Sequence, residues 1–396
     1  MQKLDRPGGP LPINTHVHVP PNASSDKTLE ALMDQAHREG VRLMGTSNFF
    51  DMQVFPEFTE RALARGILPL LGIEIITVDK ELERKGWTVQ DPYNPGRYYL
   101  QGRALNLRAT QDTDSKTQDR IRSSNDARAE KQVALLDQIM TESGLPFHVT
   151  HADVVQEVAA GAQVPEAWVS LQERHVANAF AGRLLDVDRA QRSEILEKAF
   201  GHPAEGDIED RGSLQTEIRA NLLKREQPAF VPDSPITFDE GYRLVLELGG
   251  VPTYCAVADG FGAVCDYEAP AEALAERIRD SNIHAAELVT VRNTSKCVDD
   301  YVRAFLGAGL IVTVGSEHNT PERAPLMPVC ADGPLSDFAA DAFWEGACVL
   351  AAHQDLIARG KPGFIDKEGH LLVDAAGRRR LAQYGANLIL GAPAAR

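Results

Sequence analysis

The sequence lacks the features that mark several large classes of protein. Acidic residues outnumber basic ones by 57 to 41, and the net charge of −16 leaves no basic surface to follow a nucleic-acid backbone. No segment approaches the uninterrupted apolar length of a membrane span. The N-terminus has no basic region followed by an apolar stretch, so we expect no signal peptide. These absences predict a protein without nucleic-acid or membrane partners.

Cysteine is scarce as well. The five cysteines are dispersed, and none forms a C-x-x-C pair: Cys255, Cys265, Cys297, Cys330 and Cys348. An odd, scattered set favours reduced thiols over a disulfide framework, so we predict a cytoplasmic protein.

The G-x-S-x-G, G-x-x-x-x-G-K-[ST] and G-x-G-x-x-G motifs are missing too. A chain of 396 residues can bury a core without metals, so metal-binding side chains would serve chemistry rather than stability.

What the sequence does contain is a repeated pattern of strands and helices. Its predicted strands are the apolar runs 41–46, 67–75, 251–256, 285–291 and 310–314. Its predicted helices are the amphipathic segments 28–39, 57–65, 239–248, 270–280 and 298–306. Because strands alternate with helices, we predict an α/β domain with a parallel sheet, either open or closed into a barrel.

Three stretches depart from this alternation. Residues 78–130 are polar and predict an inserted lid or binding loop, since so long a connection between strands is usually functional. Residues 152–225 are helical in pattern and predict a helical insertion. Residues 326–396 predict a helical C-terminal extension with one apolar helix near 338–356.

Two histidines lie where the first apolar run ends. Alternate residues of a strand point the same way, so the imidazoles of His16 and His18 can reach one metal ion. The prolines that follow them indicate that the strand stops there. The alternative is a pair of ordinary loop histidines.

Two carboxylates occupy similar positions further along the chain. Glu74 lies within an apolar strand, where a charge is costly unless it is paired with an arginine or lysine or bound to metal. Glu317 and His318 directly follow the last predicted strand. Because the carboxyl ends of parallel strands meet at one edge, we expect His16, His18, Glu74 and Glu317 to form one metal site.

With these segments in this order and spacing, the sequence resembles the polymerase-and-histidinol-phosphatase (PHP) family of metal-dependent phosphoesterases. The matching motifs are His16-Val17-His18, Gly72-Ile73-Glu74 and Gly315-Ser316-Glu317, with further matches at 149–154, 174–177 and 248–252. The resemblance covers about residues 12–325 and implies a distorted (β/α)7 TIM-like barrel. It also implies that His175, in the segment 174–177, joins Glu74 at a second metal ion.

The sequence departs from the family pattern at three ligand positions. Asn48, Ala256 and Asn319 stand where the family has histidines. By the resemblance, the ligands of the first ion are all retained, whereas the third ion has lost its imidazoles. We therefore expect one or two divalent ions, of zinc, manganese or iron, with Cys255 or Asp259 as replacement ligands.

Other side chains are candidates for supporting roles. Arg97 is the predicted clamp for an anionic substrate, because a guanidinium matches a phosphate or carboxylate bidentately; its alternative is a surface arginine. Arg103 and Lys296 are weaker candidates of the same kind. Glu287 is predicted to orient a metal ligand, and Asn293 to line the cleft. The remaining histidines are predicted to be structural or exposed: His37, His148, His151, His202, His284, His353 and His370.

The residues and the resemblance together predict an enzyme. The favoured function is a metal-dependent hydrolase, a phosphoesterase that acts on a small, anionic phosphorylated metabolite through a metal-activated water. Its predicted catalytic residues are Glu74, His318 and Arg97. Because the lost imidazoles weaken the match, a metal-dependent lyase or isomerase acting on a sugar or sugar acid is the alternative. A non-catalytic binding protein is the third reading, and homo-oligomer formation is left open.

Overall fold

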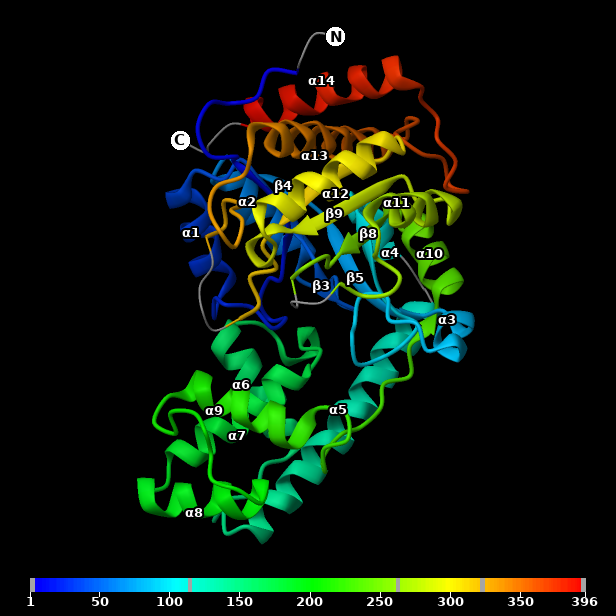
Figure 1. Ribbon diagram of the computed structural model, residues 1–396. Coiled ribbons are helices and arrows are strands. Elements are labelled where there is room, and N and C mark those ends of the chain that lie inside the picture. The colour runs from blue at the N-terminus through cyan, green and yellow to red at the C-terminus, as the bar shows by residue number, and fades with distance from the viewer. Residues whose placement is uncertain (1–3, 113–115, 261–263, 321–324, 393–396) are drawn as a thin grey trace. The chain divides into compact units, whose positions relative to one another are not determined.

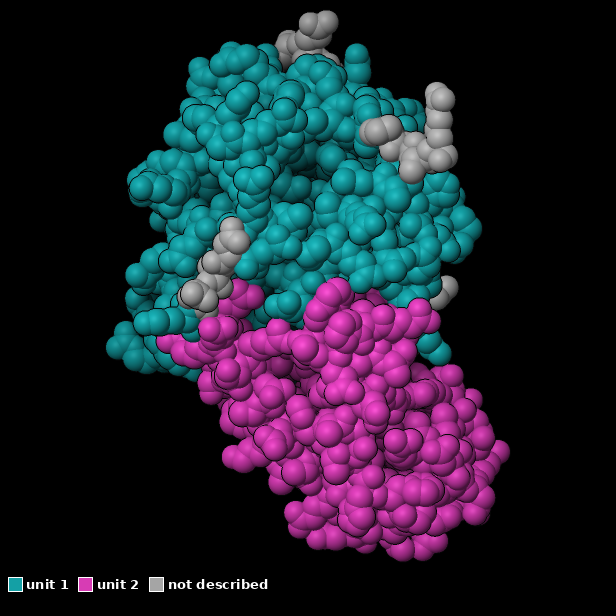
Figure 2. Space-filling model, turned by 180° about the vertical axis from the view of Figure 1, so that it is seen from behind, with its two compact units in different colours: residues 1–19, 24–117, 235–396 teal, residues 20–23, 118–234 magenta. Residues whose placement is uncertain are grey.

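The computed structural model describes residues 4–112, 116–260, 264–320 and 325–392. The chain divides into two compact units, which are coloured separately in Figure 2. Unit 1 comprises residues 1–19, 24–117 and 235–396, and unit 2 comprises residues 20–23 and 118–234. No helix in the described ranges has both the length and the apolar character needed to cross a membrane.

All the described strands belong to unit 1. They are β1 (Ile13–Val17), β2 (Leu43–Thr46), β3 (Asn48–Phe49), β4 (Leu68–Leu70), β5 (Gly72–Val78), β6 (Arg97–Arg103), β7 (Ile236–Thr237), β8 (Val251–Ala256), β9 (Ala285–Val289) and β10 (Ile311–Gly315). They form a parallel sheet of order β1-β2-β4 and a larger sheet of order β10-β9-β8-β6-β5-β3, with β7 beside β5.

The larger sheet is mixed, because β6 runs antiparallel to both β5 and β8 whereas the other pairs are parallel. An isolated bridge between Val17 and Glu317 joins the end of β1 to the segment that follows β10. The predicted α/β class is confirmed. The predicted (β/α)7 barrel is not, since the described strands form two sheets and no closed barrel is found among them.

The helices of unit 1 cover the sheets and supply much of its core. They are α1 (Leu29–Glu39), α2 (Phe55–Ala64), α3 (Lys80–Lys85), α4 (Leu107–Asp112), α10 (Phe238–Glu247), α11 (Ala271–Asp280), α12 (Ser295–Gly307), α13 (Asp337–Ala358) and α14 (Ala375–Gly391), with a short 3-10 helix, η3 (Thr290–Arg292), after β9. In Figure 1, α13 lies between α12 and α14.

Helix α1 shows how the local sequence sets these elements. The Thr28 side chain accepts a hydrogen bond from the Ala31 amide at the N-terminus, and Gly40 ends the helix with a left-handed φ of 78°. Leu32 and Met33 on its inner face are fully buried. Each such side chain contributes about 1.5–3 kcal/mol of burial free energy, so the amphipathic pattern holds the helix against the sheet.

The predicted strand 67–75 is two strands in different sheets, β4 and β5. The chain changes sheet at Gly72, whose backbone exchanges two hydrogen bonds with the Thr46 hydroxyl, at 2.9 and 2.8 Å. A Cβ at position 72 would lie 2.6 Å from the Thr46 carbonyl oxygen, so only glycine permits this approach. Because the apolar sequence continues through this point, it does not show that one strand ends and another begins here.

The segment 78–130, predicted as an inserted loop, instead contains a central strand. Its strand β6 pairs with β5 along its whole length and with β8 on the other side. The sequence did not predict this strand, because Gln101 and Arg103 are polar and do not look like core residues. Both are nevertheless buried, and their side chains are hydrogen-bonded inside the protein.

The tail 326–396 is helical as predicted, and its helix α13 matches the apolar helix predicted near 338–356. It supplies two helices, and α13 packs directly against β10 and α14. Phe343 and Trp344 of α13 are fully buried in the main core of unit 1. The tail is therefore part of unit 1, and α13 also packs against β1, the strand that carries His16.

Unit 2 is helical and has a core of its own. Apart from the first two residues of α5, it contains α5 (Lys116–Glu142), α6 (His151–Ala162), α7 (Glu173–Leu185), α8 (Arg189–Phe200) and α9 (Arg211–Ile218), with the short helices η1 (Glu166–Trp168) and η2 (Arg219–Leu223). The predicted helical character of 152–225 agrees with these elements, although the unit begins earlier and ends later.

Candidate metal centre

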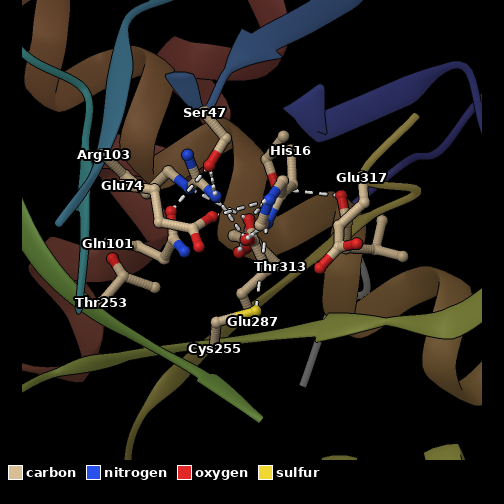
Figure 3. Close-up of polar contacts among 12 residues, drawn as sticks. His16, Ser47, Glu74, Gln101, Arg103, Thr253, Cys255, Glu287, Thr313 and Glu317 are labelled. Carbon is tan, nitrogen blue, oxygen red and sulfur yellow. Dashed lines mark hydrogen bonds and ion pairs between the residues drawn. The ribbon is translucent and has the colours of Figure 1, made fainter. Parts of the chain in front are cut away.

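Three predicted ligands lie together in unit 1. His16 and His18 come from the end of β1, and Glu74 comes from β5. The His16 Nε2 atom is 3.4 Å, and the His18 Nε2 atom 3.7 Å, from Glu74 Oε2. All three side chains are buried, with exposed fractions of 1%, 1% and 6%. One donor atom from each therefore faces a common point (Figure 3 shows His16 and Glu74).

The buried donor atoms test whether these residues fit a metal ion. Within the described structure, His16 Nε2 and Glu74 Oε2 are buried and make no hydrogen bond. A buried polar atom without a partner costs about 1–3 kcal/mol, so such atoms are normally satisfied. Imidazole nitrogens and a carboxylate oxygen are a donor set that zinc, manganese and iron accept. The three residues fit a divalent cation.

Glu287 on β9 fixes the orientation of the His16 ring. The Nδ1 atom of His16 lies 2.7 Å from Glu287 Oε1. With the proton on Nδ1, the Nε2 lone pair faces Glu74, which is the arrangement found behind many histidine ligands. Burial lowers the pKa of His16, but the charge of Glu287 and the hydrogen bonds with Cys255, Glu287 and Glu74 together outweigh burial, so that the pKa is raised. The predicted orienting role of Glu287 has this geometry.

Arg103 balances the charge of Glu287. Its Nε and Nη2 atoms lie 3.1 and 2.5 Å from the two carboxylate oxygens, and both side chains are completely buried. Burial raises the pKa of Glu287, but Arg103 and then His16 outweigh burial and hold it well below its usual range. The Thr15 hydroxyl donates a further hydrogen bond of 2.6 Å to Glu287. Arg103 is therefore a buried counter-charge and not the substrate clamp considered from the sequence.

Cys255, a predicted replacement ligand, is on the same side of His16 as Glu287. Its Sγ is 3.9 Å from His16 Nδ1, and burial raises the pKa of the thiol to about 11. With His16 and Glu287, Cys255 forms a second buried group whose donor atoms lie close enough together to hold a metal ion. Asp259 accepts hydrogen bonds from Asn293 at 2.9 Å and from the Thr294 hydroxyl at 2.6 Å. Its carboxylate and the Asn293 amide are thus joined to each other in a loop.

The structure brings the backbone of Glu317, but not its carboxylate, to the three ligands. The Glu317 carbonyl oxygen accepts a 3.0 Å hydrogen bond from the His18 amide. Its carboxylate contacts the Arg292 guanidinium instead. In the view of Figure 3, Glu317 and Glu74 lie on opposite sides of His16. The fourth predicted ligand is therefore next to the site and bound to another partner.

His318 is buried beside Glu317. Its Nε2 atom lies 3.1 Å from Asp26 Oδ2, and the two side chains are 0% and 1% exposed. Glu317 and His318 both have left-handed backbone conformations, with φ of 58° and 51°. Two such non-glycine residues in succession are strained, and strain of this kind clusters at functional sites.

Asn48 is bonded to the backbone just beyond His18. Its Oδ1 accepts a 2.8 Å hydrogen bond from the Val19 amide, and its Nδ2 donates a 3.1 Å bond to the Val19 carbonyl oxygen. Both polar atoms of Asn48 thus hold the backbone just after His18. This side chain supports the first ligand pair and leaves no donor for an additional ion.

The structure pairs two other predicted residues, Arg97 and Lys296, with carboxylates outside the group of three ligands. Arg97 begins β6, and its Nη1 is 3.8 Å from Asp91 Oδ2. Lys296 is exposed on α12 and pairs with Asp300 at 2.5 Å. His175 belongs to unit 2, so its position relative to the three ligands is not defined.

His175 uses its ring within unit 2. Its Nδ1 accepts a 3.2 Å hydrogen bond from the Gln172 amide at the start of α7. Burial lowers its pKa to about 4, the charge of Arg174 adds to this, and a hydrogen bond with the Asn22 backbone opposes it. To bind a metal ion, the ring would have to give up one of these bonds.

Sequence reasoning missed Arg292 and Asp26, the partners of Glu317 and His318. A signal for Arg292 was present, because it directly follows the predicted strand 285–291 and therefore lies at the same edge as the other candidates. Nothing in the sequence near Asp26 points to His318, which is 292 residues away.

Comparison with known proteins supports the fold. No family model matches the chain, and no curated protein matches it. A proposed metal-dependent phosphoesterase from Bifidobacterium adolescentis has a similar structure, with a TM-score of 0.55 at 17% identity over 86% of this chain and 98% of that one. An amidohydrolase from Chromobacterium violaceum, solved with bound sulfate and no metal, has a TM-score of 0.51 at 15% identity over 81% of this chain and 93% of that one. The chain shares the fold of these proteins.

Proposed function

We propose that this protein is a metal-dependent hydrolase, and specifically a phosphoesterase that acts on a small phosphorylated metabolite. The observation that carries the proposal is the buried group of His16, His18 and Glu74, whose donor atoms face one another while Glu287 orients the first of them. The length of the chain makes a purely structural ion unnecessary for folding. Such a group is therefore best explained by a catalytic ion.

The chain's own residues have distinct parts in this proposal. His16, His18 and Glu74 would hold a divalent ion, which lowers the pKa of water and polarises a phosphoryl oxygen. Glu287 keeps the His16 Nε2 lone pair directed at the site, and Arg103 keeps Glu287 ionised. One ion is better supported than two, because Asn48 is bonded to the backbone and His175 to its own unit.

The remaining catalytic assignments continue as parts of the proposal. His318 is held by Asp26 next to Glu317, at the edge where the substrate would bind. Arg97 is the sequence-based candidate for binding the phosphate, although Asp91 lies 3.8 Å from it. The structural relatives add support, since one is a proposed metal-dependent phosphoesterase and the other binds sulfate, a tetrahedral anion like phosphate.

A hydrolysis panel tests the proposal directly. The full chain is loaded with Mn²⁺, Zn²⁺ or Fe²⁺ and assayed for phosphate release from sugar phosphates and nucleotides. We expect activity with at least one ion, and its loss in His16→Ala. The exposed His37 offers a matched control, because His37→Ala removes an imidazole outside the site. Activity that survives chelation, or an active His16→Ala, would refute the proposal. Silence on phosphate esters with turnover of free sugars or sugar acids would favour the lyase or isomerase alternative.

A further inference from the structure

The side chain of Gln101 is buried next to one of the candidate metal ligands. Gln101 lies directly opposite Glu74 in the antiparallel pair of β6 and β5, and both residues are buried. Residues that face each other in such a pair project their side chains from the same face of the sheet, with Cβ atoms about 4.5–5.5 Å apart. Figure 3 shows the Gln101 amide beside the Glu74 carboxylate. The amide is therefore adjacent to the carboxylate ligand.

A chain of hydrogen bonds fixes which end of the Gln101 amide is which. The Nη2 atom of Arg103, which can only donate, lies 3.2 Å from the Ser47 hydroxyl oxygen. The proton of that hydroxyl is then donated to Gln101 Oε1, at 2.7 Å. The Ser47 amide donates a 2.9 Å hydrogen bond to the carbonyl oxygen of Val17, the residue between the two histidine ligands. The oxygen of the Gln101 amide is thus tied to the end of β1, and Nε2 is the other end.

The Nε2 atom of Gln101 makes no hydrogen bond within the described part of the chain. It is buried, and its two N–H groups can only donate. Buried polar atoms normally have a partner, so a donor of this kind calls for an explanation. Glu74 Oε2, on the strand opposite, is likewise buried without a hydrogen bond. A donor and an acceptor therefore lie unbonded on neighbouring strands at the candidate metal centre.

The chemistry of the two groups is complementary when the carboxylate holds an ion. An amide nitrogen keeps its protons, so Gln101 Nε2 can act here as a donor but not as a ligand. A carboxylate that binds a metal ion through one oxygen can accept a hydrogen bond at the other, and carboxylate ligands are commonly bonded in this way. The last torsion of Glu and Gln side chains is soft, so the groups can adjust without movement of either strand.

We propose that Gln101 is a positioning residue for Glu74. Its Nε2–H group donates to the carboxylate oxygen that does not bind the ion, and this bond holds the other oxygen at the point that His16 and His18 face. The inference rests on the metal site of the proposed function and not on the hydrolysis of phosphate esters. It gives Glu74 the kind of supporting partner that Glu287 gives to His16.

Titration of metal-free full-length protein with Zn²⁺, against a competing chelator, tests this role. Gln101→Met keeps the length of the side chain and removes the donor, so we expect it to bind Zn²⁺ about tenfold more weakly than the wild type. Thr253→Val is the matched control. Thr253 is the cross-strand neighbour of Gln101 on the other side, is equally buried, and bonds the carbonyl oxygen of Val251. Its replacement should leave the Zn²⁺ affinity unchanged.

A double-variant cycle with Glu74 separates positioning from a general disturbance of the core. If Gln101 acts through Glu74, Gln101→Met should weaken Zn²⁺ binding about tenfold in the wild-type background and not at all in Glu74→Ala. Equal losses in the two backgrounds would overturn the proposal, because the substitution would then act through the histidines.

Crystals of the wild type grown with Zn²⁺ give a measurement that does not depend on any variant. Gln101 Nε2 should lie about 2.7–3.2 Å from the Glu74 oxygen that is not bound to the ion. A separation greater than about 3.5 Å from both Glu74 oxygens would overturn the positioning role.

The outcomes separate this inference from the proposed function. If the wild type binds Zn²⁺ and hydrolyses phosphate esters, but Gln101→Met binds Zn²⁺ equally well, the positioning role is wrong and the function stands. The same holds if Gln101→Met loses affinity only for inorganic phosphate, which would make Gln101 a substrate contact. If the cycle behaves as expected but no phosphate ester is hydrolysed, the positioning role stands and the function is wrong. If the wild type binds no divalent ion, both fail.

Discussion

Two buried histidines, His16 in unit 1 and His175 in unit 2, were both predicted to bind metal, and the structure treats them in opposite ways. His16 donates from Nδ1 to a carboxylate, and its Nε2 faces Glu74. His175 accepts from a backbone amide at Nδ1 and is also hydrogen-bonded to the Asn22 backbone. Their pKa values move apart accordingly, upward for His16 and down to about 4 for His175.

The difference shows that burial alone does not decide the direction in which the pKa of a histidine moves. Both rings are removed from water, which by itself lowers the pKa of each. What distinguishes His16 is the ionised Glu287 behind it, which is in turn kept ionised by Arg103. Variants that break the contacts from Arg103 to Glu287 and from Glu287 to His16 should therefore test this comparison.

The largest effect should come from removing the buried counter-charge. Arg103→Met leaves the ionised Glu287 in the buried interior without its guanidinium partner, so we expect a loss of about 3–5 kcal/mol in the free energy of unfolding. Chemical denaturation of the metal-free protein measures it. The double variant Arg103→Met with Glu287→Gln removes both charges and should recover a large part of the loss. A single variant that costs less than about 1 kcal/mol would show that the pair is not a buried ionic couple.

A smaller effect, on metal affinity, is expected when the hydrogen bond that orients the His16 ring is weakened. In the double variant, the amide at position 287 no longer attracts the Nδ1 proton as a carboxylate does. The affinity for Mn²⁺ or Zn²⁺ should fall about 10- to 100-fold, as is typical when the partner of a histidine ligand is lost. Titration with a competing chelator measures this. Metal affinity equal to that of the wild type would mean that Glu287 has no orienting role.

The smallest and most gradual effect is a dependence of the stability on pH, which arises from His353 of unit 1. His353 is buried without a carboxylate: its Nε2 lies 3.0 Å from the Gly249 carbonyl oxygen and its Nδ1 accepts from the Phe364 amide. Burial lowers its pKa to about 4, against about 6.5 unfolded. Because the unfolded chain binds the proton first, stability should fall between pH 6.5 and 4, by about 3 kcal/mol at most.

Unfolding curves of the wild type and His353→Gln across this range isolate that contribution. The variant starts less stable, since it disturbs a tightly packed ring, but its stability should decline less steeply as the pH falls. Parallel slopes for the two proteins would contradict the assignment of His353 as a buried neutral histidine.

Much of the fold could be predicted from periodicity. The helix 28–39 and the strand 251–256 match α1 and β8 closely, because their apolar spacing, caps and terminal glycines are local signals. Strand β6 could not be found this way. Its buried Gln101 and Arg103 are hydrogen-bonded to Ser47 and Glu287, which are distant in sequence. Closure of the sheet was likewise inferred from resemblance, and the described strands do not confirm it.

Some features of the candidate site could likewise be predicted from the sequence, and others could not. His16, His18 and Glu74 were predicted from strand ends, and the structure brings them together. The Glu317 carboxylate pairs with Arg292, and the His175 ring is hydrogen-bonded to the backbone of Gln172 and Asn22. Neither pairing could be predicted from the sequence. Such choices are made by long-range packing and by the hydrogen bonds of individual atoms, which residue spacing does not encode.

Anomalous diffraction from crystals grown with Mn²⁺ or Zn²⁺ tests the central claim most directly. We expect a peak at bonding distance, about 2.0–2.2 Å, from His16 Nε2, His18 Nε2 and a Glu74 oxygen. His16→Ala crystals grown in the same way should lose that peak. The absence of a peak at this point in the wild type, or an ion bound at His175 with none beside His16, would contradict it.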